Sequence, residues 1–399
     1  MKRRLAQLPL HSGKAPPWLF QRMTKLAQAI TMAIVDEFGP AEVLRRLADP
    51  WWFQALGCVL GFDWHSSGVT TVTCGALKEA ARKCGPDLGI FVAGGKGGVS
   101  RKTPHEIAAA AERHAISGGE RLIYASRMSA KVDSAAVQDG YDLYHHAFFF
   151  TLDGPWCVVQ QGMNEQTGWA RRYHWLGETV EDFVCEPHAA IQNLTAGDPG
   201  GAPDDRGQHQ LLLNMVAREA DDNRRASVSV VQESPQKMLE EVELLTEGPT
   251  LFAPQRHRVL PADVNLRRLR QIVVEAHEQH PQNFESLLGL PGVGPAAIRS
   301  LSLLAEIIFQ APPSHRDPAA GPGPAESGSP HARRWADYSY AHGGKDGTPF
   351  PVNRETYDRN IAVLTEAVRK ARLGENDKFD ALRRLGRLES QPHAPAPEP

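Results

Sequence analysis

The chain has 399 residues, of which 41% are hydrophobic and 23% charged, a composition typical of a globular protein with one or two domains. Its formal net charge of −3 argues against a protein that coats nucleic acid by bulk charge, but allows a local basic patch. No apolar run approaches the roughly 18 residues of a membrane helix. Five cysteines without a CxxC pair argue against a disulfide framework or zinc ribbon. We expect a soluble, cytoplasmic protein with reduced cysteines.

The first 195 residues are predicted to form one domain of helices and strands. Apolar residues at helical spacing predict helices over 18–34 and from Pro40 onward. Short β-branched or apolar runs bounded by turn residues predict four strands, at Val69 to Thr73, Ile90 to Ala93, Ala147 to Thr151 and Trp156 to Gln160. Asp153-Gly154 is typical of a hairpin turn between the last two. The expected fold class is therefore α/β or α+β, followed by a mainly helical domain.

A cluster of turn-forming residues at 197–207 predicts the boundary between these domains, because the pattern beyond it becomes helical. The predicted divisions are an α/β candidate catalytic domain at 1–195, a helical domain at 208–310, a flexible linker rich in Pro, Gly, Ala and Ser at 311–334, a small helical unit at 335–388 and a disordered tail at 389–399.

A glycine-rich segment follows the predicted strand at 90–93. Gly94, Gly95 and Gly97 could present backbone amides to a phosphate, with Lys96 as the counter-charge. A solvated strand-to-helix turn explains the same residues equally well. The next helix is predicted to begin with a capping box at 103–106, where Thr and Glu stand three residues apart.

The most specific motif is NFESLLGLPGVGPAAIRSLSLL, which begins at Asn283. It predicts a short helix, a tight turn at 290–294 and a longer helix. The apolar positions expected to be buried are Phe284, Leu287 and Leu288 on the first helix and Ile298, Leu301, Leu304 and Ile308 on the second. Glycine permits positive φ in the turn, and Pro295 suits the first turn of the second helix. The N-terminus of that helix would offer free amides to an anion.

This segment, at 283–309, resembles the helix-hairpin-helix element of DNA repair and recombination proteins. In that family the hairpin amides contact consecutive backbone phosphates, so the resemblance implies largely sequence-independent DNA binding. The candidate DNA-contacting residues are Gly292, Val293, Gly294 and the flanking Arg299, together with Arg267 and Arg270 of the basic segment before the motif. The alternative is a plain αα-hairpin whose glycines serve packing.

Polar residues of the kinds that hydrolyse phosphodiesters are crowded between positions 63 and 188. Such hydrolysis needs an anion cradle, a base or metal-bound water, and cations that stabilise developing charge. The candidates are Asp63, His65, Lys131, Asp133, His145 and His174 for catalysis, with Arg171 and Arg172 for phosphate. On a strand, Lys131 and Asp133 would share a face, as a catalytic pair or an ordinary ion pair. Mg, Mn or Zn would suit the His and carboxylate ligands, although no metal-binding spacing identifies a site.

Over the whole chain a second resemblance is apparent. The segments LPLHSGKAPPWLFQRM, FQALGCVLGFDWHSSGVTT, SRMSAKVDSAAVQDGYDLYHH, VVQQGMNEQTGWARRYHW and HGGKDGTPFPV are similar to the domain of unknown function 763 family of archaea and bacteria. The similarity runs from about Leu8 to Leu388. It implies a single family architecture that contains the helix-hairpin-helix, and it implies no activity.

Three functions agree with these features, and DNA is the partner in each, with no membrane association. The first is a DNA repair or processing enzyme of nuclease type, although no D…ExK pattern lies in the predicted strands. The second is a non-catalytic DNA-binding adaptor. The third is a base-excision glycosylase, since PVNRETYDR at 351–359 is faintly similar to the PVDxHVxR segment of that superfamily. There Asn353 replaces the catalytic Asp, and Asn cannot act as a general base.

Overall fold

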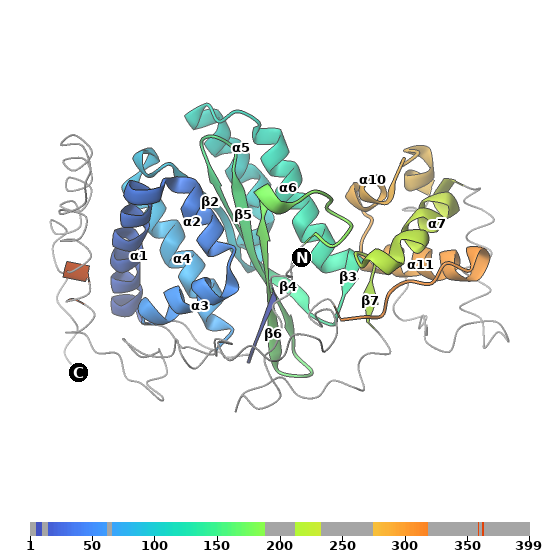
Figure 1. Cartoon of the computed structure of the whole chain (residues 1–399), viewed down its shortest axis with the longest axis horizontal. Helices are drawn as coiled ribbons and strands as arrows, with labels where there is room; N and C mark the ends of the chain where they lie inside the picture. The colour runs from blue at the N-terminus through green and yellow to red at the C-terminus, as the bar shows by residue number, and fades with distance from the viewer. Residues whose placement is uncertain are drawn as a thin grey trace. The chain divides into compact units, whose positions relative to one another are not determined.

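The computed structural model describes residues 5–9, 15–61, 66–187, 212–232, 274–317, 358 and 361–362. It confirms the expected mixture of helices and strands (Figure 1). All five cysteines lie in this part of the chain and are free thiols. None of the helices within these ranges is long and apolar enough to cross a membrane. The predictions for Asp63, His65, Arg267 and Arg270, and those for most of the linker, the C-terminal unit and the tail, fall outside the described residues.

The chain forms two compact units that each combine separate segments of sequence. The first unit contains the described residues of Met1–Pro9, Ile123–His146 and Gln160–Ser329. The second unit contains the described residues of Leu10–Leu122, Ala147–Val159 and Pro330–Pro399. Strands β4 (Asp142–Thr151) and β5 (Trp156–Asn164) contribute residues to both units.

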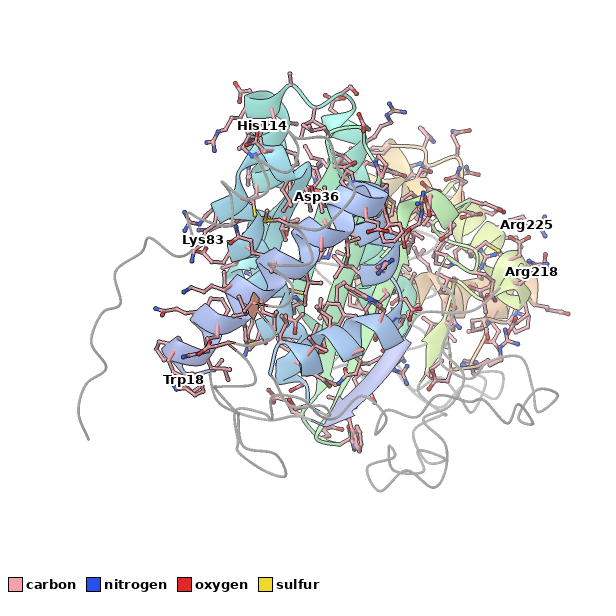
Figure 2. All side chains as sticks on the ribbon, turned by 60° about the vertical axis from the view of Figure 1, so that its left-hand side comes forward. Trp18, Asp36, Lys83, His114, Arg218 and Arg225 are labelled. Carbon is pink, nitrogen blue, oxygen red and sulfur yellow. The ribbon has the colours of Figure 1, made fainter. Side chains whose placement is uncertain are left out.

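The second unit is built on a group of helices that pack against strand β2. The elements are α1 (Pro17–Phe38), α2 (Pro40–Leu47), α3 (Pro50–Val59), α4 (Gly68–Cys84), β2 (Ile90–Lys96) and α5 (Thr103–His114). The predicted helices at 18–34 and from Pro40 are confirmed; Trp18 and Asp36 mark the two ends of α1 (Figure 2). Helix α1 packs on α4, and α4 and α5 pack on β2. Phe91 of β2 stacks on Phe150 of β4, with 5.5 Å between ring centroids.

The predicted strand at Val69 to Thr73 is wrong, because these residues form the first turns of α4. The helix continues to Cys84 through residues with good helix propensity, and Val69, Thr70 and Thr73 are buried on one face. A short β-branched run cannot by itself distinguish a strand from a buried helix segment. Tertiary packing decides the outcome, because this face of α4 packs tightly on α3. The contact is so close that a Cβ atom added to Gly57 of α3 would lie 2.3 Å from the Val69 side chain.

The strands form a five-stranded sheet in the order β1-β6-β5-β4-β2, with β1 at Leu5–Pro9 and β6 at Trp169–Leu176. The predicted strands at 90–93, 147–151 and 156–160 are confirmed, and each is longer than expected. The turn between β4 and β5 lies at Asp153-Gly154 as predicted, and the Thr151 amide donates to the Pro155 carbonyl at 3.0 Å. Strand β1 pairs antiparallel with β6, with Leu5 opposite Tyr173.

The remaining elements of the first unit follow the end of α6 (Gly119–Lys131). They are a π-helical turn at Val132–Ala136, the paired short strands β3 (Val137–Gln138) and β7 (Leu213–Asn214), and helices α7 (Asp221–Gln232), α10 (Phe284–Gly289) and α11 (Pro295–Phe309). Helices α10 and α11 both pack on α7. The buried Asn223 amide of α7 donates to the carbonyls of Ser302 and Ala311. Arg225 is exposed on α7, and Arg218 is exposed in the short 3-10 turn Arg218–Ala220 that precedes this helix (Figure 2).

Candidate functional site

Helices α10 and α11 are joined by the five residues from Leu290 to Gly294. Asn283 and Ser286 form a reciprocal capping box that begins α10. The Val293 amide then donates to the Leu290 carbonyl at 3.3 Å, and Gly292 has φ of 79°. Proline followed by a positive-φ glycine is the pattern of a type II turn. Local sequence therefore specifies the reversal between the two helices.

The apolar faces of both helices are buried nearly as predicted. The buried residues are Phe284, Leu287, Leu288, Ile298, Leu301 and Leu304. The prediction for Ile308 is wrong, since this side chain is 39% exposed. It lies in the last turn of α11, just before Gln310 ends the helix in a left-handed conformation.

The N-terminus of α11 has no side-chain cap. Gly294 is the N-cap in an extended conformation, and Pro295 follows at the first helical position. The first amides of an α-helix lack intrahelical acceptors and carry the positive end of the helix dipole. Gly292 is exposed, whereas the Val293 side chain is 1% exposed and anchors the turn. Of the three predicted contact residues in this turn, Val293 thus has a buried side chain, and its amide is already bonded to the Leu290 carbonyl.

Three side chains outside the two helices bind α10, α11 and the turn between them. The Lys131 ammonium at the end of α6 donates to the carbonyls of Leu290, at 3.1 Å, and Val293. Gln138 donates to the Pro295 carbonyl and accepts from Arg299 Nε, both at 2.9 Å. Tyr124 donates to the Glu285 carboxylate. Burial lowers the pKa of Lys131, which is here a structural cation bound to backbone carbonyls.

Lys131 and Asp133 do not share a face, because neither residue lies on a strand. Lys131 ends α6 and Asp133 lies in the π-helical turn. The Asp133 carboxylate is fully buried and accepts from Trp175 Nε1 at 2.7 Å and from the Gln160 amide. Because successive helical residues point in different directions, the two side chains serve different networks.

The Asp133 network continues through Gln160, His146 and Ser126, which are not among the candidate catalytic residues. Gln160 Oε1 lies 2.7 Å from His146 Nδ1, and Ser126 Oγ lies 3.0 Å from His146 Nε2. Since a carboxamide oxygen only accepts, Nδ1 carries the ring proton and Nε2 accepts from Ser126. All four side chains are buried. For His146 and Gln160 the available signal was a polar residue within a largely apolar strand, whereas Ser126 lies on helix α6.

Strand β6 divides its polar residues between two faces. Arg171 donates to Asp139 at 2.6 Å and in a bidentate manner to Asp317, at 3.0 and 2.9 Å. The Tyr173 hydroxyl also donates to Asp139, at 2.8 Å. Burial raises the pKa of the Asp139 carboxyl above its ordinary value, although the Arg171 guanidinium opposes this shift.

On the alternate positions of β6, Arg172 Nε donates to His174 Nε2 at 2.8 Å. Arg171, Arg172 and His174 are each at most 1% exposed, and so is His145 on β4. The structure therefore places the two arginines proposed for phosphate inside the protein.

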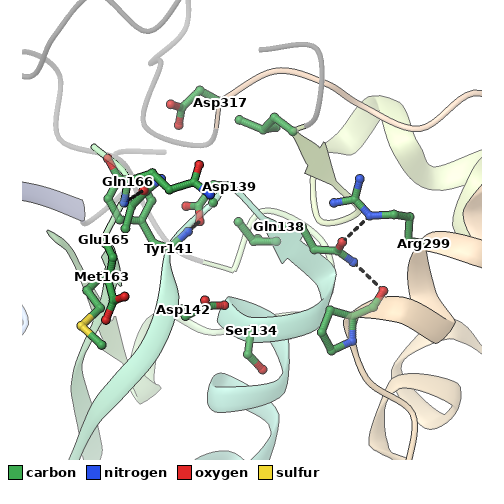
Figure 3. A pocket seen from close by; sticks show the side chains of 15 residues that line it. Ser134, Gln138, Asp139, Tyr141, Asp142, Met163, Glu165, Gln166, Arg299 and Asp317 are labelled. Carbon is green, nitrogen blue, oxygen red and sulfur yellow. Dashed lines mark hydrogen bonds between the residues drawn. The ribbon is translucent and has the colours of Figure 1, made fainter. Parts of the chain in front are cut away.

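A cavity of about 650 Å³ opens beside the turn, within the first unit (Figure 3). Pro295 and Arg299 of α11 line it on one side, and Asp139 and Tyr141 line it on another. Residues from the end of β5 and the following turn, at 163–166, complete the lining together with Ser134, Asp142, Leu212 and Asp317. The cavity is thus directly adjacent to the first turn of α11.

The glycine segment at 94–97 lies in the second unit and already binds a carboxylate of the protein. The Gly94 amide donates to Glu106 at 2.9 Å, and Lys78 donates to the same Glu106 oxygen at 2.6 Å. The predicted capping box is therefore wrong, because Glu106 is engaged with β2 and the Thr103 hydroxyl donates to the Ser100 carbonyl. Gly94 and Gly95 belong to strand β2, and Lys96 and Gly97 are exposed at its end.

A family model described as "Protein of unknown function (DUF763)" matches residues 4–352. The chain belongs to the DUF763 family. Comparison with curated proteins found no match, and comparison with solved structures found none either. Within the described ranges, this DUF763 protein has no group of three or more His, Cys, Asp or Glu side chains arranged to hold a metal ion.

His146 of this DUF763 protein is expected to make stability depend on pH. Burial lowers its pKa from the ordinary 6.5, and the hydrogen bond to Gln160 opposes this in part. As pH falls below 6.5, the unfolded chain binds a proton that the native state excludes, so stability is lost down to the lower native pKa. The loss is at most about 1.4 kcal/mol per pH unit. The free energy of unfolding, measured in urea between pH 7.5 and 5, should fall less steeply with decreasing pH in His146→Gln than in the wild type. Equal slopes of this free energy against pH would contradict the assignment.

Proposed function

We propose that this DUF763 protein binds the phosphate backbone of DNA through the turn at 290–294 and the N-terminus of α11. The observation that carries the proposal is the uncapped start of α11, where an extended glycine precedes Pro295 and an exposed glycine forms the adjoining turn. Helix N-termini of this kind bind phosphate through amides and the helix dipole. Glycine allows the phosphate to approach the backbone closely.

The interior contacts of the turn support this proposal. Lys131 donates hydrogen bonds to the carbonyls of Leu290 and Val293, and no side chain caps the start of α11. Arg299 adds a cation one helical turn further along α11. Binding through backbone phosphates would be insensitive to sequence, and log K would fall with log salt by about 0.9 for each phosphate contacted.

Three of the four candidate catalytic residues that the structure describes are buried, which favours a non-catalytic adaptor over an enzyme that uses them. Asp133, His145 and His174 are each at most 1% exposed, and the partners of Asp133 and His174 are protein groups. A phosphodiester substrate would need access to such groups. A DNA-processing reaction remains the second candidate, with Asp63 and His65 outside the described residues.

Gly294→Asp provides the test, because it should change stability and binding in opposite directions. The backbone φ of −136° suits any residue, and a Cβ atom would meet nothing closer than 3.9 Å. An N-cap aspartate accepts from the first amides and should stabilise the protein by a few tenths of a kcal/mol. It would also occupy the proposed phosphate site. We expect DNA to bind about 10- to 100-fold more weakly, as a hydrogen bond to a charged group contributes about 1.5–3 kcal/mol.

Fluorescence anisotropy with labelled duplex and single-stranded DNA at two salt concentrations measures the affinity, and thermal unfolding measures the stability. Gly98→Asp is the matched control, since it adds the same charge at another exposed glycine with open space around its Cβ position. If Gly98→Asp weakens DNA binding and Gly294→Asp does not, the phosphate binds at the glycine-rich segment after β2 and not at α11. Unchanged binding in both variants would refute the proposal.

A further inference from the structure

The cavity beside α11 has the size of a small-molecule site. Its volume of about 650 Å³ lies within the range of roughly 300–1,000 Å³ typical of ligand pockets. Pro295 and Arg299 contribute both to this lining and to the first turn of α11. A strand whose phosphate lies on the α11 N-terminus would therefore carry its sugar and base next to the opening.

The lining favours a ligand that donates hydrogen bonds. Carboxylates of Asp139, Asp142, Glu165 and Asp317 line the cavity, with Arg299 as the cation in the lining (Figure 3). Arg171 compensates two of these carboxylates, Asp139 and Asp317, from inside the protein. The exposed Asp142 and Glu165 then make the cavity unfavourable for a phosphate group and favourable for N–H donors.

The lining also provides surfaces for a planar group. Tyr141 and Met163 line the cavity with aromatic and thioether groups, which pack well against flat rings. The Asn164 side-chain oxygen accepts from the amides of Gln166 and Thr167, at 3.0 Å each, and so fixes the turn after β5. The site thus combines a flat contact surface with hydrogen-bond acceptors.

We infer that this cavity receives an amine-bearing base extruded from a DNA strand bound at the turn. This inference rests on the proposed function: the phosphate would bind at the turn, and the cavity next to α11 would bind the base of the same nucleotide. Exocyclic amines of adenine, cytosine or guanine would donate to the carboxylates, whereas thymine has no such amine. Extrusion costs a few kcal/mol and least for unpaired bases, so mismatched or single-stranded sites are preferred.

The test uses a duplex with one 2-aminopurine opposite an abasic position and reads two signals from the full chain. Anisotropy of an end label reports DNA binding, and 2-aminopurine fluorescence reports loss of stacking. We expect fluorescence to rise on saturation with the wild-type protein. Ser134→Phe, which fills the cavity from its lining, should abolish the rise while the anisotropy change persists.

Two controls separate the cavity from general effects. Ser229→Phe changes an exposed serine of α7 that, like Ser134, donates to the carbonyl four residues earlier. Asp142→Asn with Glu165→Gln keeps the shape of the lining but removes two charges, and should reduce the rise. Asp153→Asn, in the exposed turn between β4 and β5, controls for a single charge change.

Binding without a fluorescence rise, or an equal rise in Ser134→Phe, would overturn the inference and leave the proposed function intact. Absence of an anisotropy change would refute the proposed function and this inference together. Calorimetric titration with free deoxyadenosine, which carries no phosphate, distinguishes the source of the base. Saturation by the free nucleoside without DNA binding would assign the cavity to a free ligand and overturn the strand-borne base.

Discussion

Replacing Arg171 by methionine is expected to lower the free energy of unfolding by about 3–5 kcal/mol, because it leaves two carboxylates without their cation. Arg171 is 1% exposed and binds both Asp139 and Asp317. Its guanidinium also lies over the Tyr141 ring, 4.6 Å from the centroid. Methionine replaces much of the apolar volume, so the loss measures mainly the unpaired charges. Urea unfolding monitored by circular dichroism provides the value.

The chain offers a matched control for this variant. Arg225 on α7 also pairs with two aspartates, Asp221 at 3.0 Å and Asp222 at 2.6 Å, but its side chain is 71% exposed. Arg225→Met should leave stability almost unchanged, because exposed ion pairs contribute little. Adding Asp139→Asn and Asp317→Asn to Arg171→Met should restore part of the lost stability. No recovery, or equal effects of Arg171→Met and Arg225→Met, would contradict this account of the buried cluster.

Asp133→Ala is expected to destabilise the protein by about 2–4 kcal/mol, since two buried donors lose their acceptor. These donors are the Trp175 indole and the Gln160 amide. The effect should extend to His146, because Gln160 also orients its ring. Asp133→Asn keeps one acceptor oxygen and should lose less stability. Chemical denaturation of the three proteins, with the histidine ring resonances followed by NMR, measures both effects.

This result decides how a functional defect in Asp133→Ala is interpreted. A structural role predicts that stability falls and that Asp133→Asn retains most DNA binding and any cleavage that the wild type shows. A catalytic role predicts the reverse pattern, in which Asp133→Asn folds normally and loses cleavage. If the wild type cleaves DNA in the presence of metal, and Asp133→Asn has the same stability but does not cleave, then Asp133 is a catalytic candidate after all.

Several features of this protein were predictable from sequence because their causes are local. Gly39 and Pro40 separate α1 from α2, and Asp153-Gly154 forms the turn between β4 and β5. The turn at 290–294 follows from proline and glycine at positions that require their backbone angles. Each of these signals acts over a few residues and needs no distant partner.

The candidate site could be predicted only in part. The turn and the uncapped α11 N-terminus follow from the LPGVGP sequence, whereas the cavity beside them is lined by segments more than 150 residues apart. The roles of Lys131 and Asp133 likewise depend on partners that the sequence spacing does not reveal: the Leu290 and Val293 carbonyls for one, Trp175 for the other.

Apolar periodicity and turn residues were sufficient to predict helix α1, the central strands and the glycine turn, because backbone preferences and apolar spacing act locally. Tertiary structure alone decided that Val69 to Thr73 is helical, that Glu106 binds Gly94 rather than capping α5, and that Arg171 is buried. In each case the local preference amounts to about 1 kcal/mol or less. Burial of apolar surface and pairing of buried charges involve several kcal/mol, so long-range packing overrides the local preference.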